Sequence, residues 1–364
     1  MRRSRATRSK LKRRNAGRSS RSAALLRRDK RGLFSSASDL RAAYSSGMQD
    51  AKQLRASGFP AVISNSLKQR INESWTRRCE QRPSSSLTGK RIADSSHYAE
   101  GFMAELNLPS QAWLPVPKHQ SAAAVVLPSS GLNIAAIQEL LRLPLDEIIV
   151  VLEAQGEKGF AEARRLPGVT IVHITESLGQ DVGRAVGAKL TKAETVLFTD
   201  GSVFIPAERL AFLLAAADSS TDVALSDISG AVGLFSQWDD ITRIRAFMNW
   251  SLGRPDLAAN SAADLPQAWS RRAIQLVGAE LLAVPPVAHQ FVIQHKLTVT
   301  AYLIQKGTHS LIRRTIAPFS DTAAERLIIG DHIEALAAAM EHRGSRLSYL
   351  DRSRTRIAGR GGGS

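Results

Sequence analysis

The sequence predicts an α/β fold built on a doubly wound, mostly parallel sheet. Short apolar runs of the kind found in buried strands recur from residue 122 onward. Stretches in which apolar residues have helical spacing separate these runs, and the links between them are short. Such strand–helix alternation is typical of a parallel sheet covered by helices.

Five strands and four helices are predicted in this part of the chain. The first strand is an Ala/Val run that ends at Pro128-Ser129-Ser130-Gly131, a sequence typical of a turn. Apolar β-branched residues mark most of the later strands. The predicted strands are 122–127, 147–152, 169–174, 195–199 and 222–226, and the predicted helices are 132–143, 159–165, 181–190 and 206–217.

The charge divides the chain into a basic tail and a nearly neutral remainder. The net charge is +16, but residues 1–32 contain 14 Lys and Arg against one acid, whereas the other residues carry 35 basic and 32 acidic side chains. We expect residues 1–32 to be a disordered basic tail. A helical segment with a Pro-rich connector (33–118), the α/β domain with a C-terminal helix (119–345) and a second disordered tail (346–364) follow.

Two similar sequences stand out in the helical segment. Tyr44-Ser45-Ser46-Gly47-Met48 and Tyr98-Ala99-Glu100-Gly101-Phe102 share the pattern Tyr-x-x-Gly-apolar, and Pro83-Ser84-Ser85-Ser86 between them is typical of a loop. Two copies make a weak repeat, with no function evident from the pattern alone.

The composition limits the cellular compartments in which the protein is expected. A single cysteine, Cys79, excludes an intrachain disulfide and a thiolate zinc site. No apolar run reaches the 18–20 or so residues that a membrane span needs, and the N-terminus lacks the apolar core of a secretory signal. We expect a cytoplasmic protein, with peripheral attachment to a membrane through its basic tail left open; a mitochondrial-type presequence is a weaker alternative.

Polar residues follow the predicted strands. In a doubly wound sheet, ligands bind where the parallel strands end. We therefore expect a set of strand-end and helix-start residues to lie together: Pro128–Gly131, Glu153, Gln180–Arg184, Asp200–Ser202 and Asp227.

The sharpest motif is Phe198-Thr199-Asp200-Gly201-Ser202 at the end of the fourth strand. An acid placed just past a buried strand is costly unless it is paired or solvated. Such an acid commonly holds a divalent cation between two phosphates. The alternative is an ordinary turn, because Asp-Gly is frequent turn chemistry.

In order and spacing, these segments resemble the family 2 glycosyltransferases, over roughly residues 122–305. The resemblance rests on a strand, Pro and polar loop; an "EIIVVDDGS"-like strand; a Gly…Arg…Gly helix start; an Asp-x-Asp position; and an apolar/aromatic-x-Arg-Arg segment followed by Gly. These segments are Val125–Ser130, Glu147–Gly156, Gly179–Gly187, Asp200–Ser202 and Trp269–Gly278.

The resemblance implies a GT-A-like fold and a site for a nucleotide diphosphate sugar. It implies that Pro128, Ser129, Ser130 and Glu153 hold the base and ribose. Further residues assigned to the donor site are Asp181, Arg184 (at the diphosphate or the base), Asp200 and Ser202. It also implies that Asp200 binds Mg²⁺ or Mn²⁺ bridging the diphosphate, where a metal acts as a Lewis acid for the leaving nucleotide.

Two departures from the family pattern concern the chemistry. Ser202 stands at the second acid of Asp-x-Asp, so metal affinity should fall. The acidic pair that supplies the general base of inverting members is replaced near Pro285-Pro286. A base within hydrogen-bond reach of the acceptor hydroxyl is worth about 10²–10⁴-fold in rate. The remaining candidates are Glu280, His289, Asp227 and Asp331.

An acceptor site is predicted in a loop-like stretch after the fifth strand. Trp250, Arg254, Asp256 and Asn260 combine an aromatic ring with polar groups, as sugar sites do; the alternative is a packed loop with Trp250 in the core. Farther on, a helix is predicted from Ile328 to Met340. Asp331 is expected to cap it, with Glu334 three residues on, and could also reach the active site.

Three classes of function remain open from the sequence. The first is transfer of a sugar from a nucleotide diphosphate sugar to an unknown acceptor. The second is a non-catalytic relative that keeps the fold as a binding or scaffold module. The third is binding of nucleic acid or another anionic surface through residues 1–32. A nucleotidyltransferase is disfavoured, because no Gly-rich basic loop follows the first strand.

Overall fold

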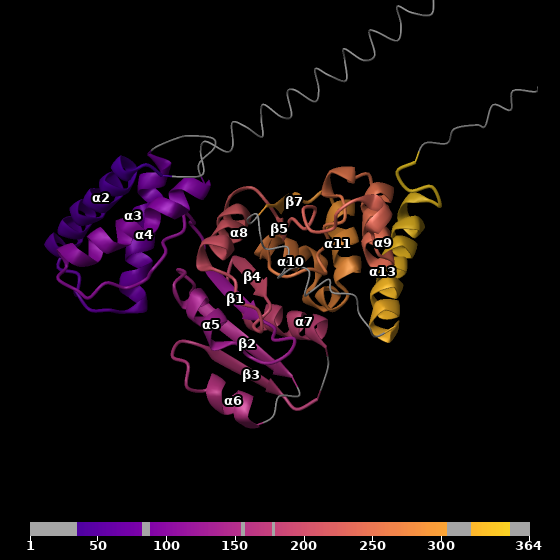
Figure 1. Cartoon of the computed structure of the whole chain (residues 1–364), viewed down its shortest axis with the longest axis horizontal. Helices are drawn as coiled ribbons and strands as arrows, with labels where there is room; N and C mark the ends of the chain where they lie inside the picture. The colour runs from indigo at the N-terminus through magenta and orange to yellow at the C-terminus, as the bar shows by residue number, and fades with distance from the viewer. Residues whose placement is uncertain (1–34, 82–87, 154–156, 177–178, 304–321, 350–364) are drawn as a thin grey trace, which may run out of the picture.

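The computed structural model describes residues 35–81, 88–153, 157–176, 179–303 and 322–349 (Figure 1). The predicted basic tail at 1–32 and the Pro83–Ser86 loop lie outside these residues. Of the predicted C-terminal tail, residues 346–349 are described. They form a turn that bonds to helix α9 (Asp240–Ser251): the Ser348 amide and hydroxyl donate to the carbonyls of Ser251 and Trp250. A C-terminal tail would therefore begin after residue 349.

The described residues of the predicted helical segment contain three helices: α2 (Ala37–Ala56), α3 (Asn65–Glu80) and α4 (Thr88–Glu105). Ser36 and Ser64 cap the first two, because their side chains accept the orphan amides of Asp39 and Leu67. Their inner faces enclose a separate core around Trp75, where aromatic rings meet. The segment thus has its own hydrophobic centre.

The Tyr-x-x-Gly pattern marks the place where α2 and α4 touch. A Cβ added to Gly47 would collide with the Tyr98 carbonyl, and a Cβ added to Gly101 would collide with the Tyr44 carbonyl. The two contacts are reciprocal, so each copy of the pattern supplies the carbonyl that the other copy's glycine meets. The weak repeat in the sequence is therefore a packing motif between two helices.

The helical segment joins the sheet domain where the parallel strands begin, which we call the amino edge. Lys68 Nζ donates to the carbonyl of Leu141, at the end of the helix that precedes the second strand (2.9 Å). His119, in the connector, contacts Glu80 Oε1 of α3 through Nε2 (2.6 Å) and Asp218 Oδ2 of α8 (Ala207–Ser219) through Nδ1 (3.1 Å). The segment thus lies away from the edge where ligands were expected.

The sheet has seven strands in the order β3-β2-β1-β4-β6-β5-β7. All paired strands are parallel except β6, which runs antiparallel to both of its neighbours. The α/β, mostly parallel fold is confirmed, and the five predicted strands are all present. The strands are β1 (Ala122–Val126), β2 (Glu147–Glu153), β3 (Thr170–Ile174), β4 (Thr195–Thr199), β5 (Val223–Ser226), β6 (Gln267–Ser270) and β7 (Val299–Tyr302).

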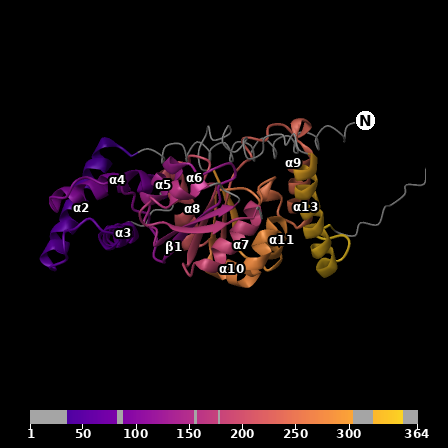
Figure 2. The ribbon, with the colours of Figure 1, turned by 90° about the horizontal axis from the view of Figure 1, so that it is seen from below.

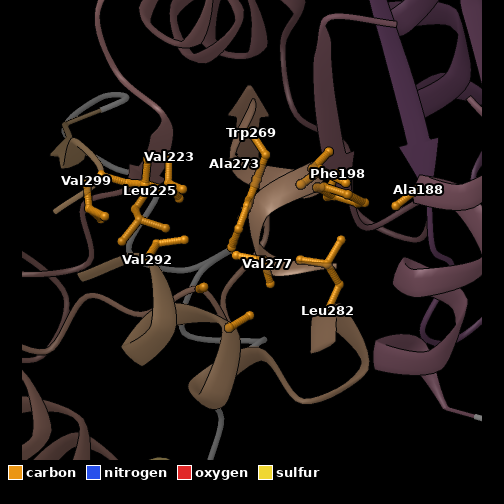
Figure 3. Close-up of a cluster of buried hydrophobic side chains, with 14 of the residues drawn as sticks. Ala188, Phe198, Val223, Leu225, Trp269, Ala273, Val277, Leu282, Val292 and Val299 are labelled. Carbon is orange, nitrogen blue, oxygen red and sulfur yellow. The ribbon is translucent and has the colours of Figure 1, made fainter. Parts of the chain in front are cut away.

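Helices cover both faces of the sheet. α5 (Ile134–Leu141), α6 (Glu157–Ala163) and α8 pack on the face that carries Val126, Val150 and Leu197. α7 (Gln180–Leu190), α10 (Arg271–Val277) and α11 (Pro285–Gln294) pack on the opposite face, where Phe198, Leu225 and Trp269 point into one core (Figure 3). Burial on both faces explains why the strands read as continuous apolar runs.

Two further helices extend this second layer. α9 (Asp240–Ser251) and α13 (Thr322–Arg343) lie side by side at the end of the molecule opposite the helical segment (Figures 1 and 2). The predicted helix start at Asp331 is wrong: α13 begins at Thr322, so Asp331 lies in the helix interior and does not cap it. The periodic pattern indicated the helix, but it began earlier than the cap-like sequence suggested.

We expect Gly47→Ala to destabilise the protein, although alanine favours helices over glycine by about 1 kcal/mol. The new methyl group would meet backbone atoms of Tyr98 and Phe102, which cannot rotate away. Overpacking of this kind costs about 1–3 kcal/mol. Urea unfolding measures the loss. Ser45→Ala, at an exposed position of the same helix, is the control and should be neutral or slightly stabilising.

We expect His119 to stabilise the protein more at pH 6 than at pH 9. Hydrogen bonding to Glu80, together with the charge and hydrogen bond of Asp218, raises its pKa above the ordinary value of 6.5. A group with a raised folded-state pKa stabilises fully below its unfolded pKa, and this contribution disappears as the pH rises through the folded pKa. The free energy of unfolding of wild type and His119→Ala, compared at both pH values, tests this; a pH-independent difference would contradict it.

Candidate functional site

The ends of β1 and β4 form the topological switch point of the sheet. From β1 the chain proceeds outward to β2 and β3, and it then returns to place β4 on the other side of β1. Loops that leave two adjacent strands in opposite directions open a crevice between them, and ligands of doubly wound sheets bind there. We call the side of the sheet on which the parallel strands end the carboxyl edge.

Asp200 ties the two loops at this switch point together. Its Oδ1 accepts the amides of Ser129 (3.2 Å) and Ser202 (2.8 Å), and its Oδ2 accepts the hydroxyl of Ser129 (2.7 Å). Ser202 Oγ in turn accepts the amide of Ser130 (2.9 Å). The carboxylate is only 6% exposed, and the cost of burying it is offset by these bonds.

Gly201 allows the loops after β1 and β4 to approach each other closely. A Cβ on Gly201 would lie 2.6 Å from a methyl carbon of Val126 and 3.0 Å from the Pro128 ring. The Gly201 carbonyl accepts the amide of Asn133, the N-cap of α5. The Asp-Gly pair therefore fixes the loop after β4 directly against the loop after β1.

The donor set at Asp200 is small for a metal ion. Both carboxylate oxygens already accept hydrogen bonds, and Ser202 brings a hydroxyl that is itself an acceptor. Among the described residues, no group of three His, Cys, Asp or Glu side chains could hold a metal. These residues fit a divalent ion only if a bound diphosphate supplies most of the oxygen ligands.

The start of α7 lies beside the end of β2, as predicted. A Cβ on Gly183 would be 2.7 Å from Glu153 Oε1, so the glycine admits this carboxylate against the helix. Pro128, Ser129, Ser130, Ser202, Glu153 and the α7 start are thus all at the carboxyl edge. The convergence expected from the strand ends is present in the structure, although it does not test what these residues bind.

Arg184 does not face this crevice. The side chain is 2% exposed, and it donates to the carbonyls of Ala262 and Ala263. Asp181, on the same helix, forms an ion pair with Arg184 (3.0 Å). Burial lowers the pKa of Arg184. The expectation that Arg184 faces a diphosphate or a base is wrong: it holds the loop that leads into β6.

A second buried arginine, on α9, binds the same loop before β6. Arg245 pairs with Asp264 at 3.0 Å, and both side chains are about 95% buried. Burial raises the pKa of the Asp264 carboxyl, while the charges of Arg245 and Arg184 oppose the rise. The Arg245–Asp264 ion pair therefore fixes the loop before β6 to α9, and the hydrogen bonds of Arg184 fix the same loop to α7. Arg245 and Asp264 carry no sequence motif, and the sequence analysis missed them.

The predicted acceptor residues are not together. Asn260 is at the carboxyl edge, where its side chain accepts the Ile228 amide (2.7 Å) and donates to Asp227 (3.1 Å). Arg254 pairs with Asp256 and donates to the carbonyl of Val299, where β7 begins at the amino edge. Trp250 is 57% exposed on α9. Neither the predicted sugar site nor the alternative of a buried Trp250 matches this arrangement.

Two of the candidate bases lie away from the switch point. Glu280 is exposed and pairs with Lys189 in the last turn of α7, which ends at the amino edge (2.7 Å). His289 is fully buried, and its Nε2 donates to Asn249 Oδ1 (2.8 Å). Burial, with the nearby His332 and arginines, lowers the pKa of His289 to about 3. The structure therefore does not support Glu280 or His289 as the general base.

Asp227 and Asp331 remain at or near the carboxyl edge. Asp227 follows β5 and accepts from Asn260 and from the Ser229 amide. Asp331, on α13, is partly buried; burial raises its pKa, and the charges of Asp181 and Glu334 raise it further.

No protein-family model and no curated protein matches this chain. Among solved structures, it is similar to glucosyl-3-phosphoglycerate synthase from Mycobacterium tuberculosis, solved with Mn²⁺, uridine diphosphate and phosphoglyceric acid (14% identity, 58% of this chain and 79% of that chain, TM-score 0.40). It is also similar to mannosyl-3-phosphoglycerate synthase from Rubrobacter xylanophilus (15%, 77% and 86%, 0.42). A mannosyltransferase from Pyrobaculum calidifontis, solved with GDP-Man and Mn²⁺, matches at 13% (81% and 87%, 0.35). These values are too low to transfer a substrate or a catalytic residue.

We expect Asp264→Ala to destabilise the protein by about 3–5 kcal/mol, because removing one partner leaves buried charge without compensation. Arg245 would then be buried without its carboxylate, whereas Arg184 would keep Asp181. Urea unfolding gives the loss. The double variant Asp264→Ala with Arg245→Met should recover part of it; a double variant less stable than Asp264→Ala would contradict the proposed pairing.

Proposed function

We propose that the chain is a glycosyltransferase that binds a nucleotide diphosphate sugar at the carboxyl edge and transfers its sugar to an acceptor. The observation that supports this most directly is the buried Asp200 between the loops after β1 and β4. It lies at the switch point of a doubly wound sheet, where such folds bind nucleotides. Family 2 membership, which the motif order suggests, is part of the proposal.

In this proposal the donor lies along the ends of β1, β2 and β4. Ser129, Ser130 and Ser202 offer hydroxyl groups around Asp200, and Glu153 with Pro128 borders the adjoining side. Hydroxyl groups can bond phosphate or ribose oxygens without adding charge. Asp200 would keep both loops in place before the donor arrives, so that little ordering is left for binding.

A divalent ion, Mg²⁺ or Mn²⁺, would bind at Asp200 only together with the donor, because one carboxylate is the charged ligand there. When bound, the ion would supply Lewis-acid assistance to the departing diphosphate. The protein groups would position the loops that hold the diphosphate oxygens. Mn²⁺ alone should bind weakly.

Asp331 is the proposed general base. A base works best when its pKa approaches the operating pH, and burial beside Asp181 and Glu334 moves the pKa of Asp331 in that direction. Asp227, whose Oδ1 accepts a hydrogen bond from Asn260, is the second candidate. The acceptor itself stays undefined.

A non-catalytic binding protein is the second candidate function. The hydrogen bonds that occupy both oxygens of Asp200 favour it, since they give the carboxylate a structural role without any ligand. The net charge of residues 1–32 additionally favours an anionic partner through counterion release. Among the described helices, none is long and apolar enough to span a membrane. A cytoplasmic location, with attachment of residues 1–32 to an anionic membrane surface, belongs to this second proposal.

We expect Asp200→Asn to fold normally but to bind UDP- or GDP-sugars at least ~10-fold more weakly with Mn²⁺, a loss of about 1.4 kcal/mol. The amide oxygen can still accept the amides of Ser129 and Ser202, and the NH₂ group can donate to the Ser129 hydroxyl, so only the charge is lost. Isothermal titration with Mn²⁺ and with EDTA measures the effect. Thermal unfolding confirms the fold.

Asp200→Ala is the companion variant, and it should lose stability as well as binding, because it removes the tie between the loops. Equal, Mn²⁺-independent binding by wild type and Asp200→Asn would rule out the metal role. Donor hydrolysis or transfer by wild type that disappears in Asp331→Asn would support catalysis; its complete absence with every donor would favour the binding protein.

A further inference from the structure

The helical segment contains a cavity of its own, apart from the crevice at the carboxyl edge. The cavity lies where α2 and α4 begin and α3 ends, and its volume is about 120 Å³. These three helices stand together at one end of the molecule (Figure 1). Each helix contributes polar side chains to the lining, among them Asp39, Trp75, Arg78, Lys90, Arg91 and Asp94.

Two of the lining side chains carry a polar atom without a hydrogen-bond partner. Within the described part of the chain, nothing accepts from the indole Nε1 of Trp75 and nothing donates to Oδ1 of Asp94, although both atoms are buried. Trp75 as a whole is only 7% exposed. A buried polar atom without a partner costs free energy, and native proteins contain few of them. One orphaned donor and one orphaned acceptor thus belong to the same cavity.

Two of the lining cations are already paired with carboxylates. Lys90 Nζ lies 2.8 Å from Asp39 Oδ2. Arg78 donates from Nε and Nη2 to the two carboxylate oxygens of Asp50, at 2.5 and 2.6 Å. These ion pairs leave no net charge on this part of the lining.

Arg91 and Asp94, about one helical turn apart on α4, are the other charged residues of the lining. Arg91 Nη2 donates to the carbonyl of Cys79 (2.8 Å). Three cations line the cavity, and they are balanced by three carboxylates when the Asp50 partner of Arg78 is included. Balanced charge favours a neutral ligand over a phosphate or an ammonium ion. An apolar ligand would leave both orphaned atoms unsatisfied.

We propose that this cavity binds a neutral ligand with several hydroxyl groups, either a free polyol or one sugar ring of a glycan. A hydroxyl oxygen can accept from Trp75 Nε1, and a hydroxyl proton can be donated to Asp94 Oδ1. A cavity of about 150 Å³ takes benzene. The slightly smaller one here therefore holds a triol such as glycerol whole, or a sugar ring by one edge. The indole ring and Ala43 offer apolar surface to the CH groups of such a ligand.

This site is independent of the proposed transferase activity. Its residues belong to α2, α3 and α4, whereas the proposed donor site is formed by residues that follow β1, β2 and β4. The two sites can therefore be filled and measured separately, and the failure of one proposal leaves the other standing.

The indole N–H resonance of Trp75 reports on the site directly. The chain has five tryptophans, and the signal that is lost in Trp75→Phe identifies Trp75 in a ¹⁵N–¹H correlation spectrum. We expect glycerol or a panel of methyl glycosides to move this signal downfield saturably, with a dissociation constant of ~1 mM or below, because the N–H gains an acceptor. A response to glycerol supports a free polyol as ligand, and a response to a methyl glycoside alone supports a sugar within a glycan.

Three variants test the contacts by isothermal titration with the probe that responds. Trp75→Phe keeps an aromatic ring but removes the N–H, and it should weaken binding at least tenfold, equivalent to about 1.4 kcal/mol. Asp94→Ala removes the acceptor and should also weaken binding. Trp113→Phe is the matched control, because Trp113 packs against the same core but does not line the cavity; it should bind as the wild type does.

The melting temperature of ligand-free Trp75→Phe provides a second measurement. It should not fall far below that of the wild type, because the lost N–H has no partner in the described part of the chain. A sharp fall would show that the indole already bonds to another part of the chain, and it would overturn the proposal. A Trp75 signal that no neutral probe moves at ~50 mM would leave the cavity to water and also overturn it. Tighter binding of inorganic phosphate than of every neutral probe would do the same.

Discussion

The carboxylate of Asp200 is the constraint on which the rest of the carboxyl edge depends. It accepts three hydrogen bonds from residues 71 positions and two positions away in sequence, and so joins the first and fourth strands of the sheet at the point where their loops would otherwise separate. Gly201 makes room for this contact. These hydrogen bonds offset the free-energy cost of burying the Asp200 carboxylate, and they fix the two loops before any ligand binds.

Much of the fold can be predicted from the sequence, because a strand that is buried on both faces has apolar residues at successive positions. Five strands were predictable for this reason. β6 and β7 were not. Trp269-Ser270, at the end of β6, reads as part of the helix that Ser270 caps, and β7 is mostly half-buried, so its sequence Val-Thr-Ala-Tyr forms no continuous apolar run. The start of α13 was misplaced because Asp331 and Glu334 imitate a capping box, which sequence spacing alone cannot distinguish from two acids in the interior of a longer helix.

The candidate site was less predictable, because a residue type does not reveal its partner. Arg184 satisfies two carbonyls of its own chain, and His289 is neutral and buried among helices. Both were chosen as residues capable of chemistry, yet tertiary contacts assign them to the scaffold. Position along the sheet was the better guide: Ser129, Glu153, Asp200 and Asp227 follow strands, and all four are at the carboxyl edge.

The attachment of the helical segment has a consequence for how the molecule can be tethered. Its contacts through Lys68 and His119 are made where the strands begin, and the basic tail precedes α2 of this same segment. A polyanion bound to residues 1–32 would therefore be tethered to the helical segment, which contacts the sheet where the strands begin. The residues at the carboxyl edge belong to other elements, so the point of attachment and the proposed donor site are separate parts of the chain.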